Sequence, residues 1–155
     1  MKQETALKLL KAGENVFLTG SAGAGKTYTL NQYINYLKAR KVPVAITAST
    51  GIAATHMNGM TIHTWAGIGI KDFLSDADLK NMKERKYLKE HLENAQVLII
   101  DEISMLHAKQ LNLVNQVLKY FKDSDDAFGG IQVIVAGGVF PFPSLGFLAV
   151  IIRKK

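Results

Sequence analysis

The stretch Gly20-Ser21-Ala22-Gly23-Ala24-Gly25-Lys26-Thr27 fits the pattern G-x-x-x-x-G-K-[ST], and it decides which fold the rest of the chain must complete. Its small residues let successive backbone N–H groups turn inward as a concave phosphate site. The helix that follows adds the positive end of its dipole. In such a loop Lys26 reaches the β- and γ-phosphates, and the Thr27 hydroxyl binds Mg²⁺. We therefore predict that these residues bind the phosphates of a nucleotide.

The segments around this loop predict an α/β fold with a mainly parallel sheet. Four continuous apolar runs read as strands buried on both faces: Val16–Thr19, Val44–Thr47, Val97–Asp101 and Ile131–Ala136. Helical spacing of apolar residues separates them, over Glu4–Ala12, Thr27–Arg40 and Ser104–Phe121. Strands that alternate with helices form βαβ units, whose strands are parallel.

The composition is that of an ordinary single domain. The 155 residues are 48% hydrophobic and 21% charged, with a net charge of +6 that favours polyanionic partners. There is no cysteine, which suits the reducing cytoplasm, and the polar N-terminus does not resemble a secretion signal. The apolar run Phe147–Ile152 is too short to span a bilayer, so no membrane partner is expected.

A second motif, Val97-Leu98-Ile99-Ile100-Asp101-Glu102, places two acids at the carboxyl end of a buried strand. Open α/β sheets bind ligands at that edge. After a phosphate loop, Asp101 is expected to share the Mg²⁺ ion, and Glu102 to orient or deprotonate the attacking water. Lys26 and Glu102 are therefore the predicted catalytic residues. A second carboxylate favours hydrolysis over transfer to a small acceptor.

Several segments resemble, in order along the chain, the motifs of the Pif1-like family of superfamily 1 DNA helicases. They are the segment with Gln3 and Ala6-Leu7, the segments Thr47–Ala54 and Thr61–Gly69, the run Asp101-Glu102-Ile103-Ser104-Met105, and Phe128–Gly137. The resemblance implies the N-terminal motor domain of such a helicase, a RecA-like P-loop NTPase sandwich of three layers. It also implies ATP and Mg²⁺ as ligands, single-stranded DNA as partner, and roles in DNA repair, recombination and telomere maintenance.

The resemblance also assigns roles to individual residues. Gln3 would read the adenine, the alternative being a frayed surface residue. Thr47, Ser49, Thr50 and Gly51 would bind the DNA backbone. His63 and Trp65 would contact or stack on bases, although a structural histidine and a core tryptophan are the alternatives. His56 and His107 receive no role. The basic residues Lys80, Lys83, Arg85, Lys86 and Lys89 form either a solvated helix face or a surface near nucleic acid.

The sequence departs from the family after Gly137. Gly138 stands where the family has Asp, and Pro141 stands where it has the Gln that senses the γ-phosphate. We expect a P-loop NTPase domain over residues 1–137 and an atypical tail over 138–155. We interpret the chain as a truncated product, with a frameshift near Gly137 as one origin. The second motor domain of the family, which supplies arginine fingers, is then missing, so weak or no turnover is expected. The alternatives are a non-catalytic nucleotide- or DNA-binding module and, with only three arginines, a small-molecule kinase.

Overall fold

The computed structural model describes residues 3–20, 25–137 and 148–151 of the chain. Its helices are α1 Gln3–Lys11, α2 Lys26–Ala39, α3 Gly51–His56, α4 Ile62–Ala66, α5 Asp76–Lys83, α6 Lys86–Asn94 and α7 Ala108–Phe121, with 3₁₀ turns at Ile103–Met105 and Ala127–Gly130. Its strands are β1 Val16–Thr19, β2 Val44–Ala48, β3 Met60–Thr61, β4 Val97–Asp101, β5 Gln132–Ala136 and β6 Leu148–Ile151. None of the helices in these ranges is long and apolar enough to cross a bilayer.

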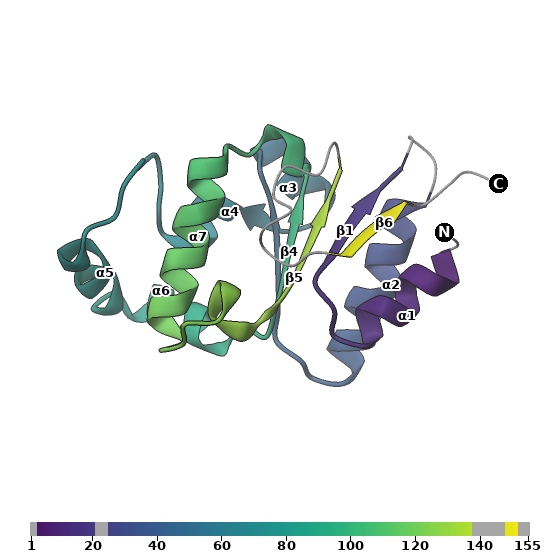
Figure 1. Cartoon of the computed structure of the whole chain (residues 1–155), viewed down its shortest axis with the longest axis horizontal. Coiled ribbons are helices and arrows are strands. Elements are labelled where there is room, and N and C mark those ends of the chain that lie inside the picture. The colour runs from purple at the N-terminus through teal and green to yellow at the C-terminus, as the bar shows by residue number, and fades with distance from the viewer. Residues whose placement is uncertain (1–2, 21–24, 138–147, 152–155) are drawn as a thin grey trace.

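The strands form one sheet in the order β3-β2-β4-β5-β1-β6, and every pair of neighbours is parallel. Helices cover both faces, with α1 and α2 on one side and α4, α5, α6 and α7 on the other (Figure 1). Because parallel neighbours need a crossover connection, this arrangement is typical of a central sheet covered by helices on both faces. The predicted fold class, an α/β sandwich of three layers, is confirmed.

Successive residues of the strands contribute side chains to two separate hydrophobic cores, one on each face of the sheet. Val16 and Leu18 of β1 pack with α1 and α2, while Phe17 between them packs with the helices of the other face. In β4, Ile99 belongs to the first core and Leu98 and Ile100 belong to the second. Side chains point to opposite faces at successive strand positions, so a continuous apolar run is what a sheet covered on both faces requires.

The structure differs from the sequence prediction at three elements. The helix expected over Ser104–Phe121 begins only at Ala108, because a 3₁₀ turn precedes it and His107 caps it by accepting from Lys109 N at 3.4 Å. Strand β3 has two residues, too few for any periodicity. Strand β6 lies within the expected tail 138–155 and pairs with β1 from Val16↔Leu148 to Thr19↔Ile151.

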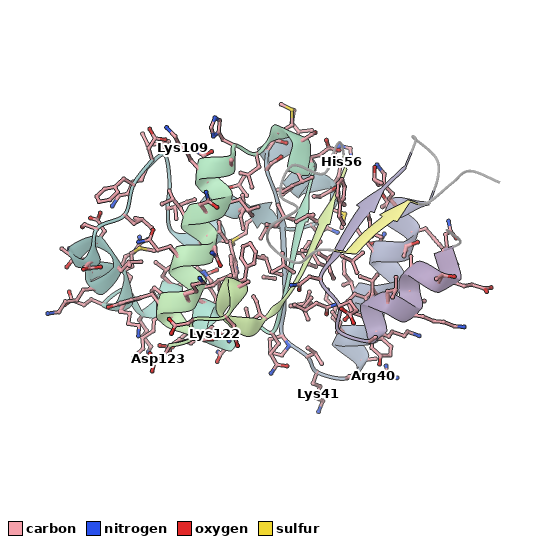
Figure 2. All side chains as sticks on the ribbon, viewed as in Figure 1. Arg40, Lys41, His56, Lys109, Lys122 and Asp123 are labelled. Carbon is pink, nitrogen blue, oxygen red and sulfur yellow. The ribbon has the colours of Figure 1, made fainter. Side chains whose placement is uncertain are left out.

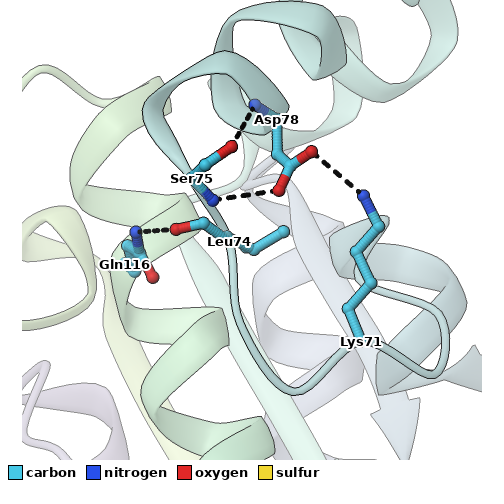
Figure 3. Close-up of polar contacts among 5 residues, drawn as sticks. All are labelled: Lys71, Leu74, Ser75, Asp78 and Gln116. Atoms are coloured by element: carbon cyan, nitrogen blue, oxygen red, sulfur yellow. Dashed lines mark hydrogen bonds and ion pairs between the residues drawn. The ribbon is translucent and has the colours of Figure 1, made fainter.

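The charged region after α4 folds as two short helices, α5 and α6. Ser75 begins α5 with a capping box: its hydroxyl accepts from Asp78 N at 3.1 Å, and its own N–H donates to Asp78 Oδ2 at 2.9 Å (Figure 3). Lys71 Nζ lies 3.5 Å from Asp78 Oδ1, and Gln116 of α7 donates to the Leu74 carbonyl. These contacts fix the α4–α5 connection against α7.

The carboxylate of Asp78 makes the stability of this region depend on pH. The N–H of Ser75, then its hydroxyl, and then the charge of Lys71 hold the pKa of Asp78 below its usual value of 3.8. Because the pKa is lowered in the folded state, the stabilisation is complete above the usual value and is lost as the pH falls through the lowered one. Asp78→Asn is therefore expected to lower the free energy of unfolding at pH 7, and to make a progressively smaller difference as the pH falls through the lowered pKa.

Urea unfolding of both proteins at a series of pH values measures this difference. Glu90→Gln, which removes an exposed carboxylate of α6, is the matched control and is expected to follow the wild-type curve. An Asp78→Asn deficit that persists undiminished at the acid end would contradict the assignment.

Candidate functional site

The predicted site residues gather at the carboxyl edge of the sheet. Strands β1, β2 and β4 are parallel, so the segments that follow them leave from the same edge. These segments carry Gly20 after β1, Ser49 after β2 and Glu102 after β4. Ligands of open α/β sheets bind at this edge, where loops and helix N-termini converge.

The described part of the phosphate loop leads directly into α2. Gly25 is the residue before the helix and has φ 96°, a left-handed conformation that favours glycine. Its carbonyl accepts from both the N–H and the hydroxyl of Thr29, each at 3.0 Å, which fixes the first turn. Lys26 is half-buried and Thr27 is exposed. The predicted contacts of Ser21, Ala22, Gly23 and Ala24 lie outside the described residues.

Gln3, predicted to read the adenine, lies beside this loop. A β-carbon added to Gly25 would overlap Gln3 Nε2, so the amide of Gln3 fills the space directly over Gly25. Helix α1 carries Gln3 there because Ala6 and Leu10 of the same helix are buried against the sheet and α2. The structure thus brings a residue from the start of the chain to the phosphate loop, and its contact with a base stays a prediction.

Strand β4 ends at Asp101, and the backbone turns at the next residue, Glu102. Asp101 is half-buried, and its Oδ1 accepts from Glu102 N at 2.9 Å. Glu102 is exposed and has φ 55° and ψ 48°, a left-handed conformation. A β-carbon at Gly137, at the end of β5, would lie 3.5 Å from Glu102 Cα, so the ends of β4 and β5 lie together.

The backbone of Glu102 is strained, since a residue with a β-carbon loses about 1–2 kcal/mol in the left-handed region. Two hydrogen bonds offset this cost: the Glu102 N–H donates to Asp101 Oδ1, and the Ser49 hydroxyl donates to the Glu102 carbonyl at 2.6 Å. Each such bond contributes about 0.5–1.5 kcal/mol net, so the two together match the strain. Such strain is often found at functional sites, where the surrounding structure holds a side chain in one direction.

A cavity of about 500 Å³ joins the two motifs. Its lining combines the helix α3 with residues of both motifs: Thr27, Thr50, Ile52, Ala53, His56, Met57, Asp101, Glu102 and Met105. Thr27 and Asp101 thus line one cavity, and each carries an oxygen ligand on its side chain. Mg²⁺ prefers oxygen ligands, and it is usually held by one or two protein groups together with phosphate oxygens and water. The donor set therefore fits the predicted Mg²⁺ site.

Two of the predicted DNA contacts are wrong. Thr47 is fully buried, and its hydroxyl donates to the Ile99 carbonyl at 2.7 Å. Ser49 is 7% exposed, and its hydroxyl donates to the Glu102 carbonyl. Both hydroxyls are directed across the sheet to β4 and its continuation, so they hold β2 to β4 and present no surface to a DNA strand.

The neighbouring candidates remain accessible. Thr50 is half-buried and caps α3, its hydroxyl accepting from Ala53 N at 3.2 Å, and Gly51 is exposed at the first position of that helix. His63 is half-buried in α4, where its carbonyl accepts from the N–H groups of Ile68 and Gly69. DNA contacts at these three residues stay predictions.

The prediction for Trp65 is wrong as well. Trp65 is 5% exposed and belongs to the core that α4, α6 and α7 form on the sheet. Its ring centroid lies 5.6 Å from that of His91, and His91 Nε2 lies within hydrogen-bond distance of the Trp65 carbonyl. The alternative of a core aromatic therefore holds.

The prediction from sequence missed the part that helix α3 plays in the site. Ile52 and His56 are four residues apart and, with Met57, line the same cavity as the two acids. Figure 2 places His56 near the upper ends of the strands, the carboxyl edge. The signal was the short apolar segment after Gly51, which the similarity to a DNA-contact motif obscured.

The described arginines lie away from the cavity. Arg40 is at the end of α2 opposite to the phosphate loop, about 20 Å away at 1.5 Å per residue, and its guanidinium stacks on the Tyr36 ring at 3.6 Å (Figure 2). Arg85 is exposed at the start of α6. Neither lines the cavity that holds Thr27 and Asp101.

Comparison with known protein families identifies the family to which the chain belongs. A family model described as PIF1-like helicase matches residues 2–144. The chain is 70% identical over 146 residues to the ATP-dependent DNA helicase Pif1 of Psychrobacter sp. strain PRwf-1, an alignment that covers 94% of the chain and 22% of that protein. The chain therefore spans less than a quarter of the length of this relative.

Solved structures agree with the sequence comparison. The crystal structure of Pif1 helicase from Candida albicans superposes with a TM-score of 0.89 at 34% identity, over 98% of this chain and 39% of that one. Pif1 helicase from Bacteroides in complex with ADP-AlF3 and ssDNA superposes with a TM-score of 0.81 at 30% identity, over 98% and 41%. The similarity to Pif1-like helicases inferred from the motifs is confirmed.

Proposed function

Because the chain belongs to the PIF1-like helicase family, we propose that it is the ATP-binding motor segment of a DNA helicase, in which ATP hydrolysis drives movement along single-stranded DNA. The observation that carries this proposal is the convergence of Thr27, Asp101 and Glu102 on one cavity at the carboxyl edge of the sheet. The Bacteroides relative in complex with ADP-AlF3 and ssDNA supports it, since this chain has the same fold at 30% identity.

Each residue of the site has a defined task in this proposal. The phosphate loop, Gly20 to Thr27, holds the phosphates, and Lys26 adds a positive charge beside the γ-phosphate. Thr27 and Asp101 hold Mg²⁺, which neutralises charge that develops on the phosphates. Glu102 accepts a proton from the attacking water or orients it. Gln3, next to Gly25, reads the adenine.

The DNA strand passes over the same edge of the sheet, near Thr50, Gly51 and His63. Exposed N–H groups and hydroxyls there bind phosphates without reading sequence. The lysines of α5 and α6 add positive charge: Lys80, Lys86 and Lys89 are exposed. A protein with this function works on the DNA of the cell, in line with the cytoplasmic location expected from the sequence.

The chain as it stands is proposed to turn ATP over slowly. An arginine that reaches the γ-phosphate raises the rate of related enzymes by about 10³- to 10⁵-fold, and neither Arg40 nor Arg85 lines the cavity. A module that binds nucleotide without turnover is the second candidate, favoured by the same observation.

A titration and a rate measurement test the proposal. We expect the 155-residue chain to bind ATP in the presence of Mg²⁺, to release phosphate slowly, to do so faster with an oligo(dT) strand, and to leave a duplex intact. Calorimetry measures the binding, and radiolabelled phosphate release measures the rate. Binding without any release would support the non-catalytic module, and transfer of phosphate to small acceptors would support a kinase. The absence of nucleotide binding would refute all three.

A further inference from the structure

Three hydrogen bonds tie the carboxyl end of β2 and the residue after it to β4 and Glu102. The Thr47 hydroxyl donates to the Ile99 carbonyl at 2.7 Å, Ser49 N donates to the Asp101 carbonyl at 3.1 Å, and the Ser49 hydroxyl donates to the Glu102 carbonyl at 2.6 Å. The last paired residues of the two strands are Ala48 and Asp101. Ser49 therefore continues the contact beyond the sheet, to the point where the chain turns.

Ser49 makes two of these three bonds, and of the two residues Thr47 and Ser49 it is the one that bonds to Glu102. Its hydroxyl donates to the carbonyl of Glu102, the residue in the left-handed conformation, and Glu102 lines the cavity. Thr47, two residues earlier, makes a similar bond within the paired part of the sheet, to a carbonyl three residues before Glu102. The two hydroxyls are both buried, yet only that of Ser49 acts on the backbone of the predicted base.

On its other side, Ser49 adjoins the proposed DNA contacts. Thr50 follows it directly and caps α3, and Gly51 begins the helix with its surface exposed. Thr50 and Glu102 line the same cavity. A bound strand that displaces the Thr50–Gly51 turn thus also moves Ser49. The hydrogen bond from the Ser49 hydroxyl then moves the backbone of Glu102.

We propose that Ser49 is a positioning residue that couples a DNA strand bound at Thr50 and Gly51 to the carboxylate of Glu102. The inference rests on the proposed function, and it assigns to this site the contact through which the two ligands influence each other. Ser49 touches neither ligand: it acts through the backbone of Glu102.

The test compares the affinity for a non-hydrolysable ATP analogue, with Mg²⁺, in the absence and presence of saturating oligo(dT). The ratio of the two dissociation constants is the coupling factor, and coupled sites typically show a factor of about 5–150. We expect a factor of at least about 5 in the wild type and a factor near 1 in Ser49→Ala, with each ligand alone bound nearly as well as before. Because coupling is reciprocal, oligo(dT) affinity must change by the same factor on addition of the analogue.

Three further variants separate positioning from a general loss of structure. Ser49→Thr keeps the hydroxyl and is expected to keep the coupling, whereas Ser49→Cys keeps the size, donates poorly and is expected to lose it. Thr47→Val is the matched control: it removes a buried hydroxyl of the same strand and is expected to keep the coupling. Thermal unfolding of each variant shows whether it is folded at the temperature of the titration.

The outcomes distinguish the inference from the proposed function. If the wild type binds the analogue and the factor is 1, or if Ser49→Ala and Ser49→Cys keep the wild-type factor, the role of Ser49 is refuted while nucleotide binding stands. Loss of coupling in Thr47→Val as well as in Ser49→Ala also refutes it, because any weakening of β2 would then suffice. If the wild type does not bind the analogue, the proposed function and the inference fail together.

Discussion

Replacing Glu102 by glutamine is expected to lower the rate of ATP hydrolysis by about 10²- to 10⁴-fold, the usual contribution of a positioned general base. The physical reason lies in the geometry of the turn. Glu102 is held in a left-handed conformation and lines the cavity with Thr27 and Asp101, so its carboxylate faces the space where the attacking water must lie. Glutamine keeps the shape of the side chain and its capacity to hydrogen-bond, and loses the basicity that accepts a proton.

The same substitution is expected to leave ATP binding nearly unchanged, because Lys26 and the loop backbone hold the phosphates. Radiolabelled phosphate release over hours at saturating Mg²⁺-ATP measures the rate, and calorimetry measures the affinity. Glu90→Gln makes the same chemical change on an exposed position of α6 and is expected to behave as the wild type. A Glu102→Gln variant that hydrolyses ATP at the wild-type rate would remove the carboxylate from the proposed reaction.

Replacing Lys26 by alanine is expected to weaken binding of ATP by about 10- to 100-fold. A hydrogen bond to a charged group contributes about 1.5–3 kcal/mol, and each 1.4 kcal/mol is a factor of ten in affinity. Lys26 is half-buried at the first position of α2, where its charge acts together with the helix dipole on the same phosphates. Hydrolysis is expected to fall at least as far, since Lys26 also stabilises charge in the transition state.

Lys38→Ala is the matched control, because Lys38 is exposed in the last turn of the same helix. It removes the same charge from the protein and is expected to leave the dissociation constant unchanged. Calorimetric titration of both variants gives the comparison, with thermal unfolding as a check that α2 is intact. Equal losses in the two variants would mean that net charge, and not the phosphate loop, governs the affinity.

The sequence predicted those parts of the molecule that follow from local pattern. Continuous apolar runs predicted strands β1, β2, β4 and β5 because burial on both faces favours apolar residues at successive positions, as Ile99 and Ile100 illustrate. The phosphate loop and the acids after β4 were found by spacing alone. Strand β3 was not predicted because its two residues are too few to show a pattern, and β6 was not predicted because its partner β1 lies near the other end of the chain.

The errors concern side chains whose neighbours are distant in sequence. Ser49 and Thr47 are hydroxyl residues at a sheet edge, which is also the pattern of a phosphate contact. Only the pairing of β2 with β4 shows that their hydroxyls reach carbonyls 52 and 53 residues away. Trp65 was misassigned for a similar reason: its burial depends on α6, and His91 is 26 residues further along the chain.

The burial of Trp65 also gives the molecule a built-in optical reporter. The chain has one tryptophan, so its intrinsic fluorescence comes mainly from a single indole that lies against α6, with His91 beside it. The emission therefore reports the packing of α4 and α6 on the sheet, and it shifts when that packing is lost. Ligand titrations can be monitored with a dye on the nucleotide or the DNA while the indole records, in the same sample, whether the scaffold has stayed intact.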